Sequence, residues 1–192
     1  MSFAVQICSN GEWRATKQIL GATDILKSPY GEYFTRDIDG HPITFFHSGV
    51  TKTRSAAACQ YAISHWKPKT IFCFGTAGSV CAELNPLDLI VLSKAAQYDC
   101  YERMEPVSSP FFESLITEMD LSWLRTEELS LTVKTGFVAT ADQDLSMDLV
   151  PMLRSHSVLA VDWESGAIAK NLCAERGSLL YRSWNYGYGS RA

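Results

Sequence analysis

The stretch from Val158 to Arg176 constrains the fold of this chain more than any other part of the sequence. It begins with a four-residue apolar run, Val158–Val161, which has the length and composition of a buried strand. Helical spacing follows, and Gly177 marks the end of the predicted helix. Four apolar residues can share one face of that helix: Ala167, Ile168, Leu172 and Cys173. A buried strand that leads into an amphipathic helix indicates an α/β fold.

Asp162, Trp163 and Glu164 lie at the junction between this strand and this helix. Open α/β sheets bind ligands at the carboxyl ends of their strands, so the two carboxylates occupy a position suited to ligand chemistry. Acidic residues also stabilise a helix start through the helix dipole, which explains the carboxylates without any ligand. The dipole does not explain the large aromatic residue between them. We therefore interpret the junction as a candidate site.

The size and charge of the chain exclude several classes of protein. With 192 residues, 46% of them hydrophobic, the chain is expected to form one domain over residues 1–192. The net charge is −4 and the sequence has no run of Lys and Arg, so we expect no nucleic-acid partner. The apolar runs are strand-sized and the N-terminus has no signal-peptide pattern, so we expect a cytoplasmic protein that does not enter a membrane.

The cysteine and histidine residues give no sign of a metal centre or a disulfide framework. The six cysteines include no C-x-x-C pair, and several of them fall inside apolar strand or helix patterns. Free thiols in a reducing compartment are the simplest interpretation. The four histidines show no ligand spacing, and we expect neither a metal nor a cofactor.

Strand-like and helix-like segments alternate along the rest of the chain. The Asp39-Gly40 pair predicts a hairpin, and the sheet is expected to be mixed because two strands follow one another closely across a small-residue turn at residues 75–79. Residues 95–110 are expected to form an irregular surface segment. The predicted strands cover residues 3–8, 43–46, 70–74, 88–93, 132–140 and 178–182, and the predicted helices cover 12–20, 54–63, 110–116 and 147–154.

Glu12 stands at a second strand-to-helix junction, near the start of the chain. It can serve a ligand or complement the helix dipole, and the sequence leaves both roles open. The loops at residues 48–53 and 75–79 contain glycine, which lets the backbone approach a ligand closely. Residues 48–53 lack the spacing of a nucleotide P-loop, and a plain tight turn is the alternative for residues 75–79.

Taken in order, these segments resemble the nucleoside phosphorylase and nucleosidase superfamily, and within it the methylthioadenosine/S-adenosylhomocysteine nucleosidases. The resemblance runs from about residue 3 to residue 182, and its most specific part is the V-[DE]-x-E-x-x-A-I-A pattern at residues 161–169. The weaker matches are Glu12, Ser48-Gly49-Val50-Thr51-Lys52, Phe74-Gly75-Thr76-Ala77-Gly78, Asp88-Leu89-Ile90-Val91 and Thr140-Ala141-Asp142.

The resemblance implies a fold and a reaction. The fold is a central mixed, partly closed sheet flanked by helices, in a protein that forms a homodimer or hexamer, and this chain lacks the C-terminal helix that is usual in the family. The reaction is cleavage of the N-glycosidic bond of a purine nucleoside or 5′-thionucleoside. Such cleavage passes through a cation-like sugar, which carboxylates stabilise.

The resemblance also implies roles for single residues. Glu164 would hold the ribose hydroxyls, Trp163 would pack on the sugar or base, and Glu12 would position the attacking water. The other expected substrate-binding residues are Ser48, Thr76, Ala77, Gly78, Phe137, Val138, Asp162, Asn185 and Tyr186.

One departure from the family pattern concerns the acid that protonates the leaving base. The family's last strand runs R-x-x-[ST]-D, whereas Arg182 here is followed by Ser183-Trp184-Asn185-Tyr186, and no acid follows Arg182. An amide cannot act as an acid and an ordinary Tyr has a pKa near 10. General-acid help contributes about 10²- to 10⁴-fold. Two alternatives follow: another group activates the base, or the chain is a catalytically impaired protein that binds a nucleoside or base.

The sequence also bears on whether water or phosphate is the nucleophile. Phosphorylases of the superfamily carry a G-D-P-x-R-type loop near the first strand, and this chain has Cys8-Ser9-Asn10-Gly11-Glu12 there. We therefore expect water as the nucleophile. A purine nucleoside phosphorylase that uses phosphate is the alternative, because Arg14 or Arg54 could reach an anion.

Overall fold

The computed structural model describes residues 3–101, 109–122, 124–125, 133–174 and 180–185. The described helices are α1 (Asn10–Ile19), α2 (Lys52–Trp66), α3 (Ser109–Ser114), η2 (Met147–Leu149), α4 (Val150–Ser155) and α5 (Ser165–Ala174). The described strands are β1 (Phe3–Ile7), β2 (Leu26–Lys27), β3 (Glu32–Ile38), β4 (His41–His47), β5 (Thr70–Phe74), β6 (Thr76–Ser79), β7 (Leu89–Gln97), β8 (Thr117–Glu118), β9 (Val133–Thr140), β10 (Val158–Asp162) and β11 (Leu180–Asn185).

The first half of the sheet contains β1 at its centre. β1 pairs in parallel with β4 on one side and with β5 on the other. β3 and β4 form the predicted hairpin, and both turn residues have positive φ, 53° at Asp39 and 79° at Gly40. Two central residues with φ above zero match the right-handed twist of the flanking strands, which is why the Asp-Gly signal is reliable here.

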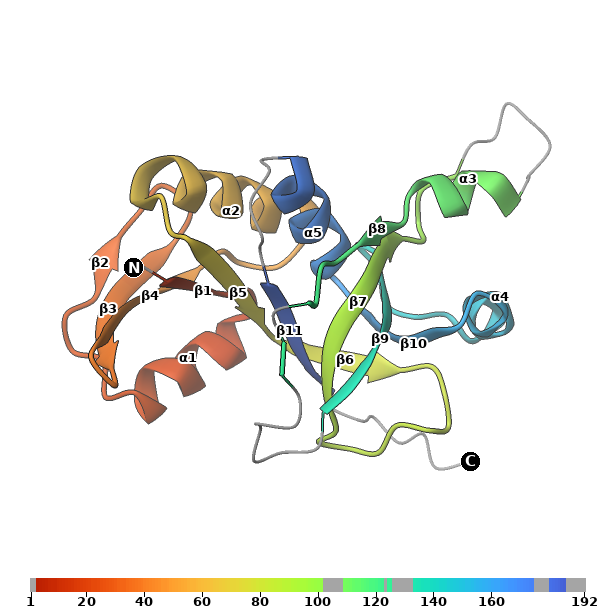
Figure 1. Ribbon diagram of the computed structural model, residues 1–192, viewed down its shortest axis with the longest axis horizontal. Coiled ribbons are helices and arrows are strands. Elements are labelled where there is room, and N and C mark those ends of the chain that lie inside the picture. Colours follow the sequence, from red (N-terminus) through yellow and green to blue (C-terminus); the bar gives the residue numbers. More distant parts are fainter. Residues whose placement is uncertain (1–2, 102–108, 123, 126–132, 175–179, 186–192) are drawn as a thin grey trace.

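The second half of the sheet is mixed, as predicted. β6 runs antiparallel to β10, β10 and β7 both run parallel to β9, and β7 runs antiparallel to β8. β11 joins the two halves, because it pairs with β5, β6 and β7 (Figure 1). The pairing of one strand with both β6 and β7 makes the sheet curl, so the fold class is the mixed, partly closed sheet that the sequence predicts.

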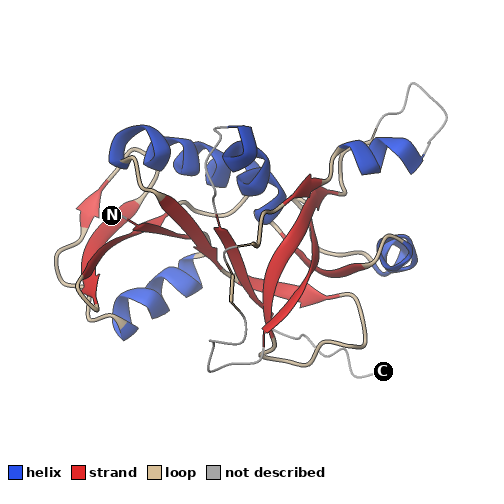
Figure 2. Ribbon diagram, viewed as in Figure 1, coloured by secondary structure: helices blue, strands red, loops and turns tan. Residues whose placement is uncertain are grey.

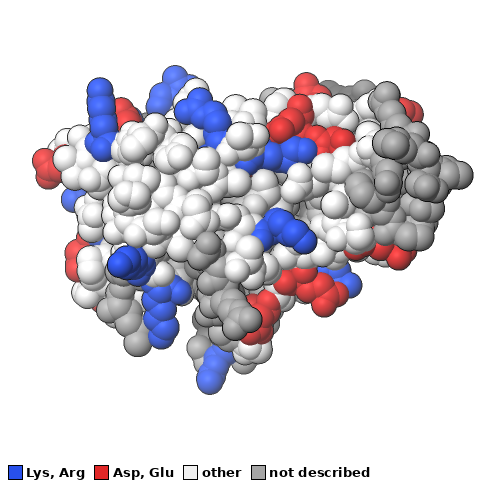
Figure 3. Space-filling model, turned by 90° about the horizontal axis from the view of Figure 1, so that it is seen from above, with Lys and Arg blue, Asp and Glu red and all other residues white. Residues whose placement is uncertain are grey.

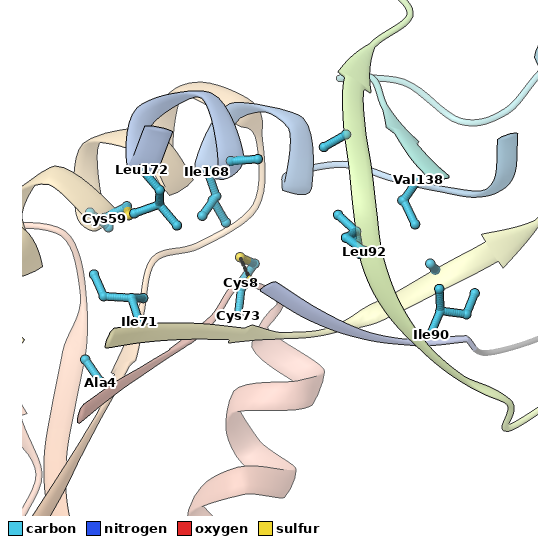
Figure 4. Close-up of a cluster of buried hydrophobic side chains, with 14 of the residues drawn as sticks. Ala4, Cys8, Cys59, Ile71, Cys73, Ile90, Leu92, Val138, Ile168 and Leu172 are labelled. Atoms are coloured by element: carbon cyan, nitrogen blue, oxygen red, sulfur yellow. Dashed lines mark hydrogen bonds between the residues drawn. The ribbon is translucent and has the colours of Figure 1, made fainter. Parts of the chain in front are cut away.

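Helices flank this sheet on both faces. α2 and α5 lie side by side on one face, and α1 lies on the opposite face near β1 and β5 (Figure 2). α5 packs through Ile168 and Leu172, which are almost fully buried and meet Ile71 and Leu92 of the sheet in the main core cluster (Figure 4). Three residues of the predicted helix face, Ala167, Ile168 and Leu172, are therefore buried, whereas the fourth, Cys173, is exposed.

Two segments differ from the expectation. Residues 76–79, expected to be part of a bend, form the short strand β6, because their backbone groups pair with β10 and β11. Residues 95–97, expected to be irregular, continue β7 through pairing with β9. Both differences arise from long-range pairing, which local sequence does not encode.

The chain end lies partly outside the described residues. β11 begins at Leu180, so Ser178 and Leu179 of the predicted strand are outside them, and so is the region after Asn185 in which the family's C-terminal helix is expected to be missing. None of the described helices is both long enough and apolar enough to cross a bilayer. On the face seen in Figure 3, the described Lys and Arg side chains are scattered among acidic and uncharged ones.

Candidate active site

Glu12 lies in the first turn of α1, directly after β1. The Ser9 hydroxyl accepts a hydrogen bond from the Glu12 N–H, and the Glu12 carboxylate accepts one from the Ser9 N–H, both at 3.2 Å. This reciprocal pair is a capping box, which satisfies two free amides at the helix start. The other carboxylate oxygen accepts hydrogen bonds from the N–H and the hydroxyl of Thr76, both at 2.8 Å. The helix-start role and a ligand role are thus compatible, because one oxygen of the Glu12 carboxylate caps the start of α1 and the other lies beside Thr76 of β6.

Glu164 lies between β10 and α5. Its carboxylate accepts a hydrogen bond from the Thr51 N–H at 3.3 Å, at the start of α2. Burial, the nearby Asp162 carboxylate and, more weakly, Glu12 together raise the pKa of the Glu164 carboxyl to about 8. A carboxyl group with a pKa shifted this far by burial and like charges is typical of a functional site.

Glu12 and Glu164 line the same cavity, which has a volume of about 270 Å³. Thr76 and Trp163 form part of its wall, and it lies beside the Gly75 backbone. The two carboxylates come from opposite ends of the sequence and are brought together because β1 and β10 both end at this side of the sheet. The cavity is large enough for a sugar-sized ligand.

A second cavity of about 550 Å³ adjoins the first. Thr76 and Trp163 line both cavities, so they lie at the boundary between them. Ala77 and Gly78 of β6 line the second cavity, together with the loop residues 143–145. The two cavities are neighbours that share Thr76 and Trp163, and the second is the wider one.

Asp162 lines the second cavity, but its carboxylate accepts hydrogen bonds at the start of α5. It accepts hydrogen bonds from the hydroxyl and the N–H of Ser165, at 2.9 and 3.1 Å, and from the hydroxyl of Thr140. Its side chain is 5% exposed. Asp162 therefore acts as an N-terminal cap that fixes the backbone on either side of Glu164.

Three of the expected substrate-binding residues lie in the protein core. Ser48, Phe137 and Val138 are buried, and none of them is among the described residues that line either cavity. Phe137 stacks on Phe112 at a ring-centroid distance of 6.1 Å. Asn185 is the last described residue of β11, and its backbone pairs with that of Ala77. Tyr186 lies outside the described residues.

Sequence reasoning missed other residues of this region. Val50 lines the first cavity, and Tyr98, Gln143, Asp144 and Leu145 line the second. Residues 141–144 were noticeable as an acidic loop directly after a strand, and that position was the available signal. Tyr98 stood in a polar, aromatic segment that could line an opening or form a surface loop, and the surface loop was the favoured interpretation.

Polar contacts among Lys52, Asp99 and Asp142 connect the loops around the cavities. The Lys52 side chain forms an ion pair with Asp99, and the Lys52 N–H donates a hydrogen bond of 2.8 Å to Asp142. Asp99 in turn accepts a hydrogen bond from the Asp142 N–H at 2.9 Å. These contacts fix the start of α2, including the Thr51 N–H that donates a hydrogen bond to Glu164.

The thiols of Cys8 and Cys73 lie 4.0 Å apart and line the first cavity (Figure 4). All six cysteines are free. Burial raises the pKa of the Cys73 thiol well above its ordinary value, so it stays protonated at neutral pH. Among the described residues, no group of three or more His, Cys, Asp or Glu side chains is placed to hold a metal ion.

Two carboxylates facing one small cavity, beside a wider cavity bounded by an aromatic ring, define a site for a ligand with a polar centre and a flat extension. The sequence model of the phosphorylase superfamily, a protein family, matches residues 12–179, so the chain belongs to that superfamily.

Individual relatives are nucleosidases and a related hydrolase by name. The chain is 24% identical over 143 residues to the 5′-methylthioadenosine/S-adenosylhomocysteine nucleosidase of Glaesserella parasuis. The matched stretch is 69% of this chain but only 62% of that protein. The structure of the corresponding nucleosidase of Campylobacter jejuni has a TM-score of 0.83 at 19% identity, covering 100% of this chain and 88% of that one. Futalosine hydrolase of Helicobacter pylori also has a TM-score of 0.83, at 18% identity over 97% and 88% of the two chains.

Proposed function

We propose that this chain cleaves the N-glycosidic bond of a purine nucleoside or 5′-thionucleoside with water. The observation that carries the proposal is that Glu12 and Glu164 line one cavity of about 270 Å³. Cleavage of this bond builds positive charge on the ribose ring, and two carboxylates beside the ring stabilise that charge. The names of the relatives support hydrolysis over phosphorolysis.

Glu12 is the residue that we assign to the water. Three donors hold its carboxylate in place: the Ser9 N–H, the Thr76 N–H and the Thr76 hydroxyl. A carboxylate held this firmly can orient a water molecule and accept its proton without reorganising in the transition state.

Glu164 is the residue that we assign to the ribose hydroxyls. Its partner in the free protein is the Thr51 N–H, at the long distance of 3.3 Å. The ionised form of Glu164, which increases as the pH approaches its pKa of about 8, can accept hydrogen bonds from both hydroxyls and so fix the sugar relative to the water.

The base side of the substrate is assigned to the second cavity, which Trp163 shares with the first. The flat, apolar indole suits a purine ring. We assign side-chain contact with the base to residues 143–145 and contact with the β6 backbone to Ala77 and Gly78, because these residues line the second cavity, whereas Phe137 and Val138 have buried side chains and could offer only backbone groups.

The experiment incubates the protein with methylthioadenosine, adenosine and inosine, with and without phosphate, and measures free base, ribose and ribose 1-phosphate. Hydrolysis predicts free base and the free sugar at a rate independent of phosphate. Glu12→Gln should lower kcat by about 10²- to 10⁴-fold. Because Gln keeps the shape of the side chain, the loss then reports on the carboxylate rather than on the fold.

Two other outcomes would replace the proposal. Base release that requires phosphate and yields ribose 1-phosphate would make the chain a phosphorylase. Binding of a nucleoside or of adenine without any base release, at high protein concentration, would make it a binding protein. The missing acid after Arg182 favours this second alternative.

A further inference from the structure

Tyr98 is a buried residue on the wall of the second cavity. It follows the last residue of β7, and its N–H donates a hydrogen bond of 2.9 Å to the carbonyl of Thr140. The side chain is 2% exposed and packs in the core cluster that contains Val80 and Val161, both of which also line the cavity. The backbone and the ring of Tyr98 are therefore fixed.

The hydroxyl of Tyr98 has no hydrogen-bond partner within the described part of the chain, although its oxygen is shielded from solvent. Buried tyrosine hydroxyls normally find a partner, because an unpaired polar group inside a protein destabilises the fold. Tyr98 as a residue lines the second cavity, and a ligand there that reaches the shielded hydroxyl would supply the missing acceptor.

Three of the polar side chains that line the same cavity, those of Thr76, Ser79 and Asp162, have hydrogen-bond partners within the protein. The Thr76 hydroxyl donates to Glu12, and the Ser79 hydroxyl donates to the carbonyl of Cys81. Asp162 accepts from Ser165 and Thr140. Burial, together with the nearby carboxylates of Asp99 and Asp162, raises the pKa of the Tyr98 hydroxyl to about 12. The group therefore stays protonated and can act as a donor.

We propose that the Tyr98 hydroxyl donates a hydrogen bond to an acceptor nitrogen of the purine base held in the second cavity. This inference rests on the proposed function, which puts the base there. The hydroxyl keeps its proton throughout. Its effect is to select a base with a correctly placed acceptor and to stabilise the negative charge that the base gains as it leaves the sugar. A donor of this kind contributes part of what the acid after Arg182 would supply in the family.

The test compares Tyr98→Phe with the wild type in two measurements. Calorimetry measures the affinity for adenine, and thermal unfolding measures the stability of the free protein. The expected result is that Tyr98→Phe weakens adenine binding by roughly three- to tenfold, the effect of one hydrogen bond, while the melting temperature is unchanged or higher. Stability should not fall, because the variant removes an unpaired buried hydroxyl.

Two controls separate ligand contact from structure. Tyr33→Phe alters a partly buried tyrosine that packs on Trp66 in the other half of the sheet, with ring centroids 4.9 Å apart, and should leave adenine affinity unchanged. Binding of 1-deaza-, 3-deaza- and 7-deazaadenine identifies the acceptor. The analogue that lacks the accepting nitrogen should bind the wild type and Tyr98→Phe equally.

The remaining outcomes overturn the inference. Equal adenine affinity in wild type and Tyr98→Phe rejects it while leaving the proposed function intact, provided that the wild type releases base from nucleosides. A loss of affinity that is the same for adenine and all three deaza analogues means that Tyr98 acts through the fold alone. If the wild type neither binds adenine nor releases base, the proposed function fails, and this inference fails with it.

Discussion

Among the single residues, Glu164 combines a ligand role with a cost to stability. Its pKa is about 8 in the folded protein, against 4.5 for an ordinary Glu. Between these two values the folded state binds more protons than the unfolded state, so this residue makes the fold less stable as pH rises from about 4.5 to 8. The dependence is at most about 1.4 kcal/mol per pH unit.

Glu164→Gln removes this dependence. We expect the melting temperature of the variant, relative to the wild type, to increase steadily from pH 5 to pH 8, while its base release is strongly reduced. The measurement is thermal unfolding of both proteins at several pH values, with base release assayed alongside. A difference in melting temperature that stays constant over this range would show that the Glu164 pKa is not raised.

The sequence predicted Glu12 and Glu164 because each stands directly after a strand and before a helix, which is a local pattern. It could not predict the raised pKa of Glu164, which depends on burial and also on the carboxylates of Asp162, Glu12 and Asp142, two of them distant in the sequence. The family resemblance assigned Phe137 and Val138 to the base through their backbone groups; their side chains are buried in the core, and that assignment stays a prediction.

Among the elements, α5 is the helix whose position decides where Glu164 lies. Its second residue, Gly166, packs directly on β7, so that a Cβ atom there would lie 2.9 Å from the carbonyl oxygen of Ala96. That neighbour is backbone and cannot move aside. The close approach of α5 to the sheet therefore depends on the absence of a side chain at Gly166.

We expect Gly166→Ala to destabilise the protein by about 1–3 kcal/mol, the usual effect of overpacking. Ala favours a helix by only about 1 kcal/mol over Gly, so the clash outweighs the propensity. Gly11→Ala in α1 is the matched control, because a Cβ atom there meets only the Ser9 side chain at 4.0 Å. Urea unfolding of both variants checks the prediction, and it is contradicted if the two shift stability in the same direction.

Helix α5 was predictable from its apolar spacing, and β6 was not. Residues 76–79 are small and follow a glycine, which locally favours a turn, and only their pairing with β10 and β11 makes them a strand. The extension of β7 to Gln97 has the same origin in its pairing with β9. Periodicity predicts elements that bury one face, whereas short strands depend on partners far away in the sequence.

In the whole molecule, the first cavity is built from both ends of the described chain. Glu12 and Cys8 belong to the β1–α1 region, and Trp163 and Glu164 belong to the β10–α5 region. The sequence indicated this meeting only through the family resemblance, since composition and periodicity say nothing about which strands become neighbours. A ligand in this cavity contacts both regions at once.

Ligand binding should therefore stabilise the molecule as one unit. Glu12→Gln, which is expected to bind methylthioadenosine without cleaving it, should gain about 2.7 kcal/mol at a ligand concentration 100 times the Kd. Thermal unfolding with increasing methylthioadenosine measures this gain, and uridine serves as the control ligand. The prediction is contradicted if the melting temperature stays the same at concentrations that saturate binding in calorimetry.

The position of Trp163 at the boundary of the two cavities gives the protein an internal optical probe. Trp13, by contrast, is 3% exposed and packs between Phe34 and His47, away from both cavities. A molecule that enters from either side changes the polarity around the Trp163 indole and leaves that of Trp13 unaltered. Occupancy can thus be followed by intrinsic fluorescence, without attaching a dye.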